Sequence, residues 1–426
     1  MQIGCLRAKC PVVLLLALLG CGAKAAPSPA VAADDLAPGT AVDAGSDSPD
    51  TAATADDTAM PDSADSQTGD GASPDADSTA AKPTAWPVAA AGPYVCGFRI
   101  VQLTYTLPGT LGERTLPLHI WYPATAAEGD HPAYLGAYVD SHAYTDAPLA
   151  APAYAGGYPL LVHSHGYQGF SGNSATYMCH LATHGWVALA PEHVGNTLVD
   201  TPPKLPLVAS LQRPLDVRAT LDWAAKAPAT DPLAGHLDLG HVGMSGHSFG
   251  TYTVWATAGA PFDLKKIEAR CLAGSWPDCT PELIAAFGGP LADPRPLTFI
   301  ALAGDGGDLF VAGGRNTVKK PVLQMNGTLD DSGQTALYAD VTGVDLTWVD
   351  VTGGCHQLYG LGNNIKGDPA CKQLADEDGF AIVKPWFLAW LRYHVLGDRG
   401  AEVTGIVTGS VSVSPLMKFA HKTPTQ

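Results

Sequence analysis

The sequence predicts an α/β fold: a mostly parallel, eight-stranded type of sheet with helices on both faces. Three observations support this class. Between residue 86 and the end of the chain, short apolar segments alternate with helical patterns. Most of these segments are continuously apolar, as strands buried on both faces are. One of them runs directly into Gly246-His247-Ser248-Phe249-Gly250, a sequence typical of a strand–turn–helix junction.

The individual elements follow from periodicity and from the turn residues that bound them. Strands are expected over 98–106 and 116–122, an antiparallel edge pair, and then over 159–164, 186–190, 242–245, 297–303, 321–326 and 347–351. Helices are expected over 175–184, 211–226, 251–258, 332–338 and 378–396. Strands that alternate with helices form a parallel sheet, and its chemistry collects at the carboxyl ends of the strands.

The N-terminus is typical of an export signal. Arg7 and Lys9 precede an apolar run over 12–19 that is too short to span a bilayer. Residues 1–20 are therefore expected to be a signal peptide. Leu18-Leu19-Gly20-Cys21 resembles the bacterial lipobox, which implies cleavage before Cys21 and lipid attachment to it. The alternative is an ordinary signal peptide cut near Ala23 or Ala26.

Residues 21–85 have the composition of a disordered tether. They are rich in Ala, Asp, Ser and Pro, and their twelve aspartates face only Lys24 and Lys82, so this stretch carries −10 of the overall charge of −17. Such a segment buries too little apolar surface to offset its ordering entropy. The remaining residues divide into a catalytic domain over 86–415 and a tail over 416–426, which also contains His421.

The charge of the folded region limits which classes of binding partner are expected. Residues 86–426 are mildly acidic and contain no basic stripe. Because binding to nucleic acid needs clustered Lys and Arg, no nucleic-acid partner is expected. We expect an exported, monomeric protein held at the outer membrane or cell surface by its lipid anchor, or otherwise a periplasmic or secreted one.

Cysteine usage predicts disulfides. Cys5 and Cys10 leave with the signal and Cys21 is the lipidation candidate, which leaves six cysteines, an even number in an exported protein. Fifteen connectivities are possible. The local pairs are the natural choice, and the remaining two cysteines would then join: Cys271–Cys279, Cys355–Cys371 and Cys96–Cys179. No Cys-x-x-Cys pair favours a metal site.

The chemistry predicted for this chain is nucleophilic catalysis by Ser248. A serine on the strained turn needs a histidine as base and a carboxylate to orient that base, in the chain order Ser, Asp or Glu, His. His356 follows the strand over 347–351 in a glycine-rich loop. Asp330 follows the strand over 321–326 and is the preferred acid, with Asp331 as the second choice and a candidate helix cap.

Two backbone N–H groups are expected to stabilise the oxyanion. One belongs to Phe249, directly after the nucleophile. The other is assigned to Tyr167, in the loop His163-Ser164-His165-Gly166-Tyr167 that follows the strand over 159–164. His165 is expected to be structural.

These motifs together resemble one family. Residues 158–197, Arg213-Pro214-Leu215-Asp216-Val217 and 246–250 are similar to the α/β-hydrolases grouped with platelet-activating-factor acetylhydrolase and the bacterial dienelactone-hydrolase-like serine esterases. The resemblance implies the triad Ser248, Asp330 and His356, and the oxyanion donors Tyr167 and Phe249. It departs from true dienelactone hydrolases, which use a cysteine nucleophile. The insert over 267–284 has no counterpart in the resemblance and is expected to line the acyl pocket.

The expected activity is hydrolysis of small-molecule or lipid esters, with short acyl chains or acetylated phospholipid-like substrates. No cofactor or metal is required. Secreted polyester hydrolases of the cutinase type share the fold and a disulfide-stapled histidine loop, so they are an alternative. A catalytically inactive surface-binding lipoprotein is the second alternative.

Overall fold

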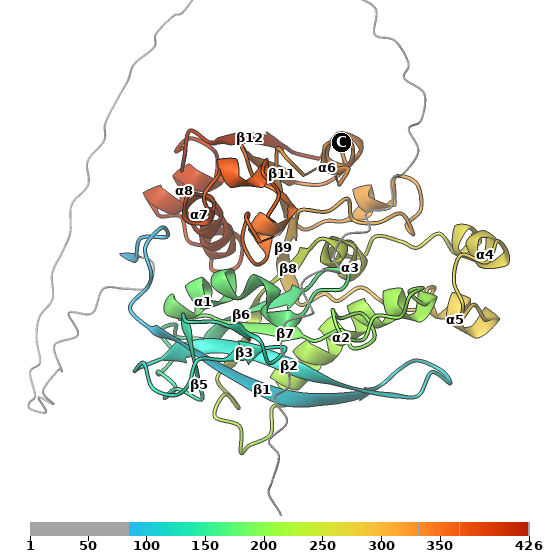
Figure 1. The fold of residues 1–426 in the computed structure, drawn as a ribbon, viewed down its shortest axis with the longest axis horizontal. Coiled ribbons are helices and arrows are strands. Elements are labelled where there is room, and N and C mark those ends of the chain that lie inside the picture. Colours follow the sequence, from blue (N-terminus) through green and yellow to red (C-terminus); the bar gives the residue numbers. More distant parts are fainter. Residues whose placement is uncertain (1–84, 331, 366, 425–426) are drawn as a thin grey trace, which may run out of the picture. The chain divides into compact units, whose positions relative to one another are not determined.

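The computed structural model describes residues 85–330, 332–365 and 367–424 (Figure 1). The signal-peptide, Cys21 and tether predictions, and the alternative acid Asp331, lie outside these residues. In the described part of the chain, the helices are too short or too polar to cross a bilayer.

The centre of the domain is a ten-stranded sheet with the order β12-β11-β10-β9-β8-β6-β7-β2-β1-β5. Its strands are β1 Val95–Thr106, β2 Glu113–Ala124, β5 Ala143–Thr145, β6 Tyr158–Ser164, β7 Val187–Pro191, β8 Leu237–His247, β9 Pro296–Leu302, β10 Val322–Gly327, β11 Leu346–Val351 and β12 Met417–Lys422. β2 pairs antiparallel with β1 and β7, β12 pairs antiparallel with β11, and the other pairs are parallel. Two short strands, β3 Ala133–Tyr134 and β4 Tyr138–Val139, form a separate hairpin.

Helices cover both faces of the sheet. They are α1 Ala175–Thr183, α2 Leu207–Ala225, α3 Phe249–Ala258, α4 Leu264–Leu272, α5 Pro281–Ala286, α6 Gln334–Asp340, α7 Asp376–His394 and α8 Ala401–Val407, with short 3₁₀ turns η2 Ser171–Ser174, η3 Gly314–Thr317, η4 His356–Tyr359 and η5 Cys371–Gln373. Successive side chains of a strand point to opposite faces. Leu160 accordingly packs into the core with α2 and α3, whereas Leu161 packs into the core with α1 and α7.

The predicted fold class is confirmed, and each of the eight predicted strands is present. The sheet is wider than expected because β5 extends it beyond β1 and β12 extends it beyond β11. The chain continues as part of this sheet past residue 415, so the catalytic domain does not end there.

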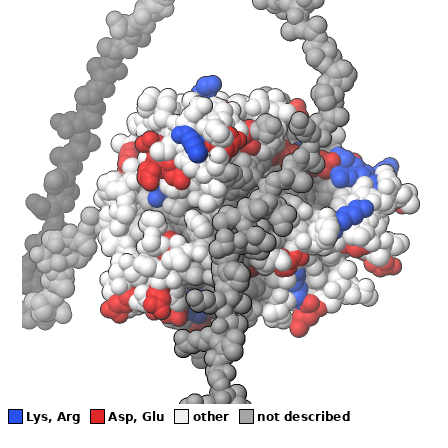
Figure 2. Space-filling view, in the orientation of Figure 1, with Lys and Arg blue, Asp and Glu red and all other residues white. Residues whose placement is uncertain are grey.

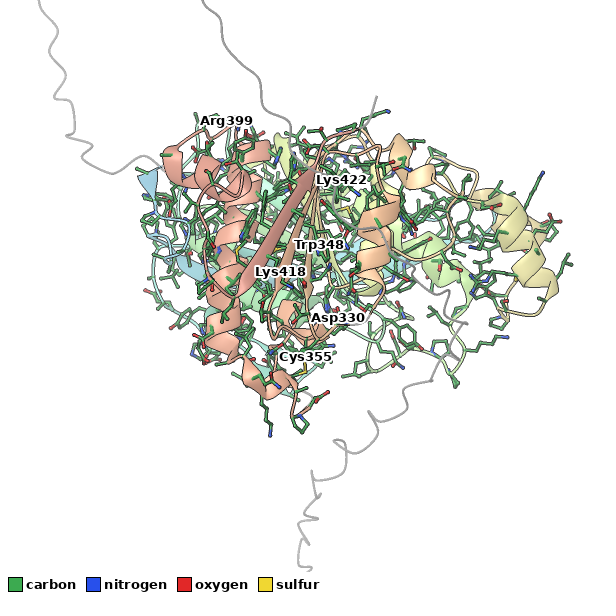
Figure 3. All side chains as sticks on the ribbon, turned by 90° about the horizontal axis from the view of Figure 1, so that it is seen from above. Asp330, Trp348, Cys355, Arg399, Lys418 and Lys422 are labelled. Carbon is green, nitrogen blue, oxygen red and sulfur yellow. A yellow bond between two sulfur atoms is a disulfide. The ribbon has the colours of Figure 1, made fainter. Side chains whose placement is uncertain are left out.

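The sequence predicts a tail over 416–426, and this is wrong for Met417–Lys422. These residues form β12, in which Phe419 stacks on Trp386 of α7 with ring centroids 5.7 Å apart. The imidazole of His421, expected in a polar tail, lies 2.9 Å from the hydroxyl of Thr347 on β11. Lys418 and Lys422 lie four residues apart on this strand (Figure 3), and charged side chains on an edge strand protect it against further pairing.

Three disulfides hold segments of the domain together. They are Cys96–Cys179, Cys271–Cys279 and Cys355–Cys371, the three pairs that the sequence favours. The first joins β1 to α1 and the second closes the α4–α5 segment at the margin of the domain (Figure 1). The third closes the loop that follows β11.

The parallel strands bring the predicted site residues to one edge of the sheet. β6, β8, β10 and β11 run in the same direction, so their carboxyl ends share that edge. Surface charge is mixed on the face shown in Figure 2, where Lys and Arg lie among Asp and Glu, apart from a small basic group over α4.

Candidate active site

Ser248 lies on a sharp turn between β8 and α3. Its backbone has φ 57° and ψ −119°, a left-handed conformation that is costly for a residue with a side chain. The flanking glycines make the turn possible. A Cβ on Gly246 would lie 2.2 Å from the carbonyl oxygen of Gly250, and one on Gly250 would lie 2.0 Å from that of Ser164 on β6. The turn therefore exposes the Ser248 hydroxyl at the end of the strand.

His356 and Asp330 come from two neighbouring strands. Asp330 follows β10, and His356 begins η4 after β11. The Nδ1 atom of His356 lies 3.1 Å from Oδ2 of Asp330. The Asp330 side chain is 3% exposed and the His356 side chain 27%, so the carboxylate lies behind the ring and the ring reaches the surface of the site.

Further donors hold Asp330 in its ionised form. Ser332 donates its hydroxyl to Oδ1, and Gln334 donates Nε2–H to Oδ2 at 2.6 Å. Burial by itself would raise the pKa of Asp330, but the hydrogen bonds and charge interaction with His356, together with those from Ser332, outweigh it and lower the pKa below its ordinary value. The acid therefore stays charged beside the base. The Ser332 hydroxyl is also 3.2 Å from Nδ1 of His356.

Four of the five residues predicted for catalysis line one cavity of about 400 Å³. They are Tyr167, Ser248, Phe249 and His356, whereas Asp330 lies behind two lining residues, His356 and Ser332. Within the described residues, no hydrogen bond joins the Ser248 hydroxyl to the imidazole. Such bonds are often long in a free enzyme and shorten when substrate binds.

The two predicted oxyanion donors have the backbone positions that the role requires. Phe249 is the first residue of α3, and the first N–H groups of a helix have no partner within it. Tyr167 lies in a tight turn closed by a hydrogen bond from Gly169 N–H to Gly166 O at 3.2 Å, with Gln168 at φ 51°. In such a turn the N–H of the second residue is not used by the turn itself.

Arg213 connects these two donors, and sequence reasoning missed this role. Its guanidinium is fully buried and donates to the carbonyl oxygens of His165 and Gly166 at 2.5 and 2.9 Å. The same group lies 4.4 Å from the centre of the Phe249 ring and also bonds to Asn196. The only sequence signal was its place in the Arg213-Pro214-Leu215-Asp216-Val217 motif of the family resemblance. His165 has the structural role expected, because its Nε2 accepts the N–H of His193 at 3.0 Å.

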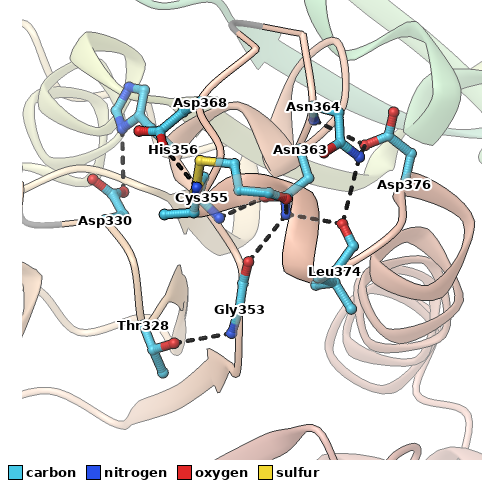
Figure 4. Close-up of a disulfide and its surroundings, with 12 residues drawn as sticks. Thr328, Asp330, Gly353, Cys355, His356, Asn363, Asn364, Asp368, Leu374 and Asp376 are labelled. Carbon is cyan, nitrogen blue, oxygen red and sulfur yellow. Dashed lines mark hydrogen bonds and ion pairs between the residues drawn. A yellow bond between two sulfur atoms is a disulfide. The ribbon is translucent and has the colours of Figure 1, made fainter.

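The loop that carries His356 is fixed by a disulfide and one buried amide (Figure 4). Cys355 is bonded to Cys371, and its N–H donates to Oδ1 of Asn363 at 2.6 Å. The Nδ2 of Asn363 donates to the carbonyl oxygens of Gly353, Cys371 and Leu374. Asn363 is 2% exposed, and no sequence pattern distinguished it from the other asparagines.

A second histidine supports the same loop. The Nε2 atom of His247, the residue before the nucleophile, lies 2.9 Å from the carbonyl oxygen of His356. Burial lowers the pKa of His247 to about 3, so the ring is neutral and its Nε2–H can donate to this carbonyl. Its Nδ1 lies 3.3 Å from Nδ2 of Asn173.

Comparisons with known proteins address the fold of the chain. The model of the chlorophyllase family matches residues 139–277, a segment that contains Tyr167, Arg213 and Ser248. Among solved structures, the ferulic acid esterase from Streptomyces cinnamoneus superposes with a TM-score of 0.53 over 79% of this chain and 98% of that chain. This chain has the α/β-hydrolase fold.

The α/β-hydrolase fold does not decide the reaction. The Streptomyces esterase is only 20% identical, and 424 solved chains match significantly. A fold shared so widely supports many activities. No curated protein sequence matches the chain significantly.

Two expectations about the site are wrong. The insert over 267–284 does not line the active-site cavity, because none of the described lining residues belongs to it. It closes on itself through Cys271–Cys279 instead. The helix after Asp330 begins at Gln334 with Gly333 at its N-cap, two residues later than the expected start at 332. Among the described residues, no group of three or more His, Cys, Asp or Glu side chains could hold a metal ion.

Proposed function

We propose that the protein is a serine carboxylic-ester hydrolase that acts through an acyl-enzyme. One observation carries the proposal: Ser248, on its strained turn, lines the same cavity as His356, whose ring is hydrogen-bonded to the buried Asp330. Nucleophile, base and acid are thus assembled from three strand ends in the order typical of this fold. The names of the matched family and structure, a chlorophyllase and a ferulic acid esterase, favour an ester substrate.

The reaction uses only side chains and backbone groups of this chain, and no cofactor. His356 accepts the proton of the Ser248 hydroxyl as its oxygen attacks the ester carbonyl carbon. The oxyanion accepts hydrogen bonds from the N–H groups of Tyr167 and Phe249. Collapse of this intermediate expels the alcohol, which takes the proton from His356. Water then attacks the acyl-enzyme by the same route and releases the acid, and Asp330 stabilises the imidazolium in both halves.

The substrate class we propose is a short-acyl ester or an acetylated, phospholipid-like ester. A cavity of about 400 Å³ at the surface accommodates a small acyl group against Leu205, Phe249 and Ala303. Initial rates on p-nitrophenyl esters of increasing acyl length check this, with the highest kcat/KM expected at acetate to butyrate. Higher activity on an insoluble polyester would favour the cutinase-like alternative.

The location of the protein in the cell is part of the same proposal. Three disulfides fit an exported protein, because such bonds persist in oxidising compartments. We place the enzyme as a monomer on a lipid anchor at Cys21, at the outer membrane or cell surface.

The direct test is Ser248→Ala with p-nitrophenyl acetate as substrate. We expect kcat to fall by at least about 10³-fold, since nucleophile removal in this type of triad costs more than that. Ser412→Ala, an exposed serine far along the chain, is the control and should keep full activity. Full activity in Ser248→Ala would refute the proposal. Matched ester and amide substrates separate an esterase from a peptidase.

A further inference from the structure

A second cavity, of about 550 Å³, lies beside β1 and β2. Its lining comes from these two strands, from the hairpin that contains Tyr134, from the end of β5, from Phe170 and from the segment that follows β7. Among the described residues, none lines both this cavity and the active-site cavity. The catalytic mechanism makes no use of it.

Two buried polar side chains in this cavity are incompletely hydrogen-bonded. His119 and Glu192 are each 8% exposed. Within the described chain, neither Nδ1 of His119 nor Oε1 of Glu192 has a hydrogen-bond partner. The other oxygen of Glu192 accepts the N–H of Ser171 at 2.8 Å, so the carboxylate is held in place while Oε1 stays unsatisfied. A buried acceptor without a donor is costly, and a ligand that donates to it recovers that cost.

The sheet register places these two side chains together. His119 on β2 is opposite Ala190 on β7. The N–H of Glu192 donates to the carbonyl oxygen of Pro117 at 2.8 Å, which continues the same ladder by one pair. Because side chains alternate between faces, His119 and Glu192 point to the same face as diagonal neighbours. An ammonium group, which has three hydrogens to donate, suits two acceptor side chains placed in this way.

Aromatic rings form the walls of the cavity. The His119 ring lies 5.4 Å from Phe98 and 6.1 Å from Tyr134, and Tyr134 lies 6.2 Å from Phe170. Flat aromatic faces hold an apolar body and also attract a cation through their quadrupoles. Burial lowers the pKa of His119 to about 4, so this ring adds no positive charge to the wall at neutral pH.

The charge of the lining favours a cation. Three carboxyl groups, from Asp146, Glu192 and Asp200, line the cavity against one arginine. Burial raises the pKa of Glu192, and a cation bound beside it would favour its ionised form. That arginine, Arg99, is already paired with Asp231 at 2.6 Å. Burial by itself would raise the pKa of Asp200, but hydrogen bonds from Gly195 and Thr197 together outweigh it and lower the pKa, which favours the ionised form.

We propose that this cavity binds a small organic amine in its protonated form, with the ammonium group between Glu192 and His119 and an aromatic or aliphatic body against the rings. The ammonium donates to Oε1 of Glu192 and to the free nitrogen of His119, and it supplies the counter-charge that the buried carboxylate lacks. An uncharged alcohol of the same shape would leave that charge uncompensated.

Calorimetric titration of the full-length protein tests the proposal, with benzylamine as the probe and benzyl alcohol as its uncharged counterpart. We expect benzylamine to bind at least about 10-fold more tightly, because charge-assisted hydrogen bonds are roughly twice as strong as neutral ones. Ser248→Ala should bind it equally well. Equal affinity for the two probes, or no binding of either, would overturn the proposal.

Variants locate the bound amine. Glu192→Gln, which keeps an acceptor for the Ser171 N–H, should reduce benzylamine affinity about 10-fold and leave benzyl alcohol unchanged. Glu268→Gln, an exposed acid on α4, is its charge-matched control and should have no effect. Ala133→Trp fills the exposed rim of the cavity and should abolish binding, whereas Leu205→Trp in the active-site cavity should not. The reverse result for the two tryptophan variants would assign the amine to the active site and refute the inference, even if Glu192→Gln failed to fold.

Discussion

Arg213 shows what a single side chain contributes to this site. Its guanidinium bonds to the carbonyl oxygens directly before Tyr167 and packs on the ring of Phe249. It therefore fixes the relative position of two N–H groups that come from distant parts of the sequence. A planar, five-donor group suits this task, and lysine cannot reproduce it.

Arg213→Lys should lower kcat about 10²-fold on p-nitrophenyl acetate with little change in KM. The charge is retained, but the oxyanion donors lose their alignment, and loss of one such donor costs 10²–10³ in turnover. Steady-state kinetics measure the effect, and a thermal melt shows whether the variant is folded. Arg218→Lys, further along the same helix, should behave as the wild type. A rise in KM with unchanged kcat would argue that Arg213 serves binding instead.

The two adjacent carboxylates allow a matched test of the acid. Asp330→Asn should reduce kcat by about 10³–10⁴-fold, because the imidazole then loses the charge that orients it and stabilises its protonated form. Asp331→Asn should retain activity within a few fold. Steady-state kinetics on the two purified variants test this assignment. A larger loss of kcat in Asp331→Asn than in Asp330→Asn would assign the role of catalytic acid to Asp331.

Sequence reasoning reached Ser248, His356 and Asp330 because each lies directly after a recognisable apolar strand. Arg213 and Asn363 could not be found in this way. Their roles depend on contacts with backbone carbonyl oxygens that come close only in the folded chain. The sequence around these two residues does not distinguish them from the other arginines and asparagines of the chain.

At the scale of elements, the buried strands were predictable and the edges of the sheet were not. β8 and β10 are apolar runs between turn residues, whereas β12 alternates Lys, Phe, Ala and His in the manner of a polar terminus. Its strand character comes from packing on Trp386 and from pairing with β11, neither of which is local.

The disulfide of the histidine loop should act on catalysis before it acts on stability. Replacing both Cys355 and Cys371 with alanine should lower kcat about 10-fold or more, because His356 directly follows the staple and small displacements of a catalytic group are costly. Replacing Cys271 and Cys279 removes a staple of the same kind outside the site and should leave kcat unchanged. Activity and melting temperature are measured for both. If the variant without Cys355 and Cys371 loses kcat and melting temperature to the same degree, a specific effect on the histidine loop is contradicted.

At the scale of the whole molecule, many buried histidines are kept neutral. Burial lowers the pKa of His163, His180 and His247 to about 3, and that of His119 and His184 to about 4. In the unfolded chain the same groups have pKa values near 6.5. Between about pH 6.5 and 4, the unfolded chain therefore binds protons that the folded chain does not, and stability falls as the pH is lowered.

Urea unfolding at pH 7.5, 6 and 5 should show a falling midpoint, with each of these histidines contributing up to about 1.4 kcal/mol per pH unit. His180→Gln removes the contribution of one histidine and should reduce the slope of unfolding free energy against pH by up to that value. His142→Gln, an exposed histidine, is the control and should leave the slope unchanged. A midpoint that does not move between pH 7.5 and 5 would contradict the interpretation.

The Cys355–Cys371 disulfide of the histidine loop would also determine when the proposed esterase becomes active. A Cys355–Cys371 bond forms only where thiols are oxidised, and reducing compartments keep the pair open. A newly made chain would thus carry its base on a loop held by hydrogen bonds, such as those of Asn363 and His247, without the covalent link. On the export route proposed above, passage through the membrane would then complete the site, and the proposed ester hydrolysis would begin outside the producing cell.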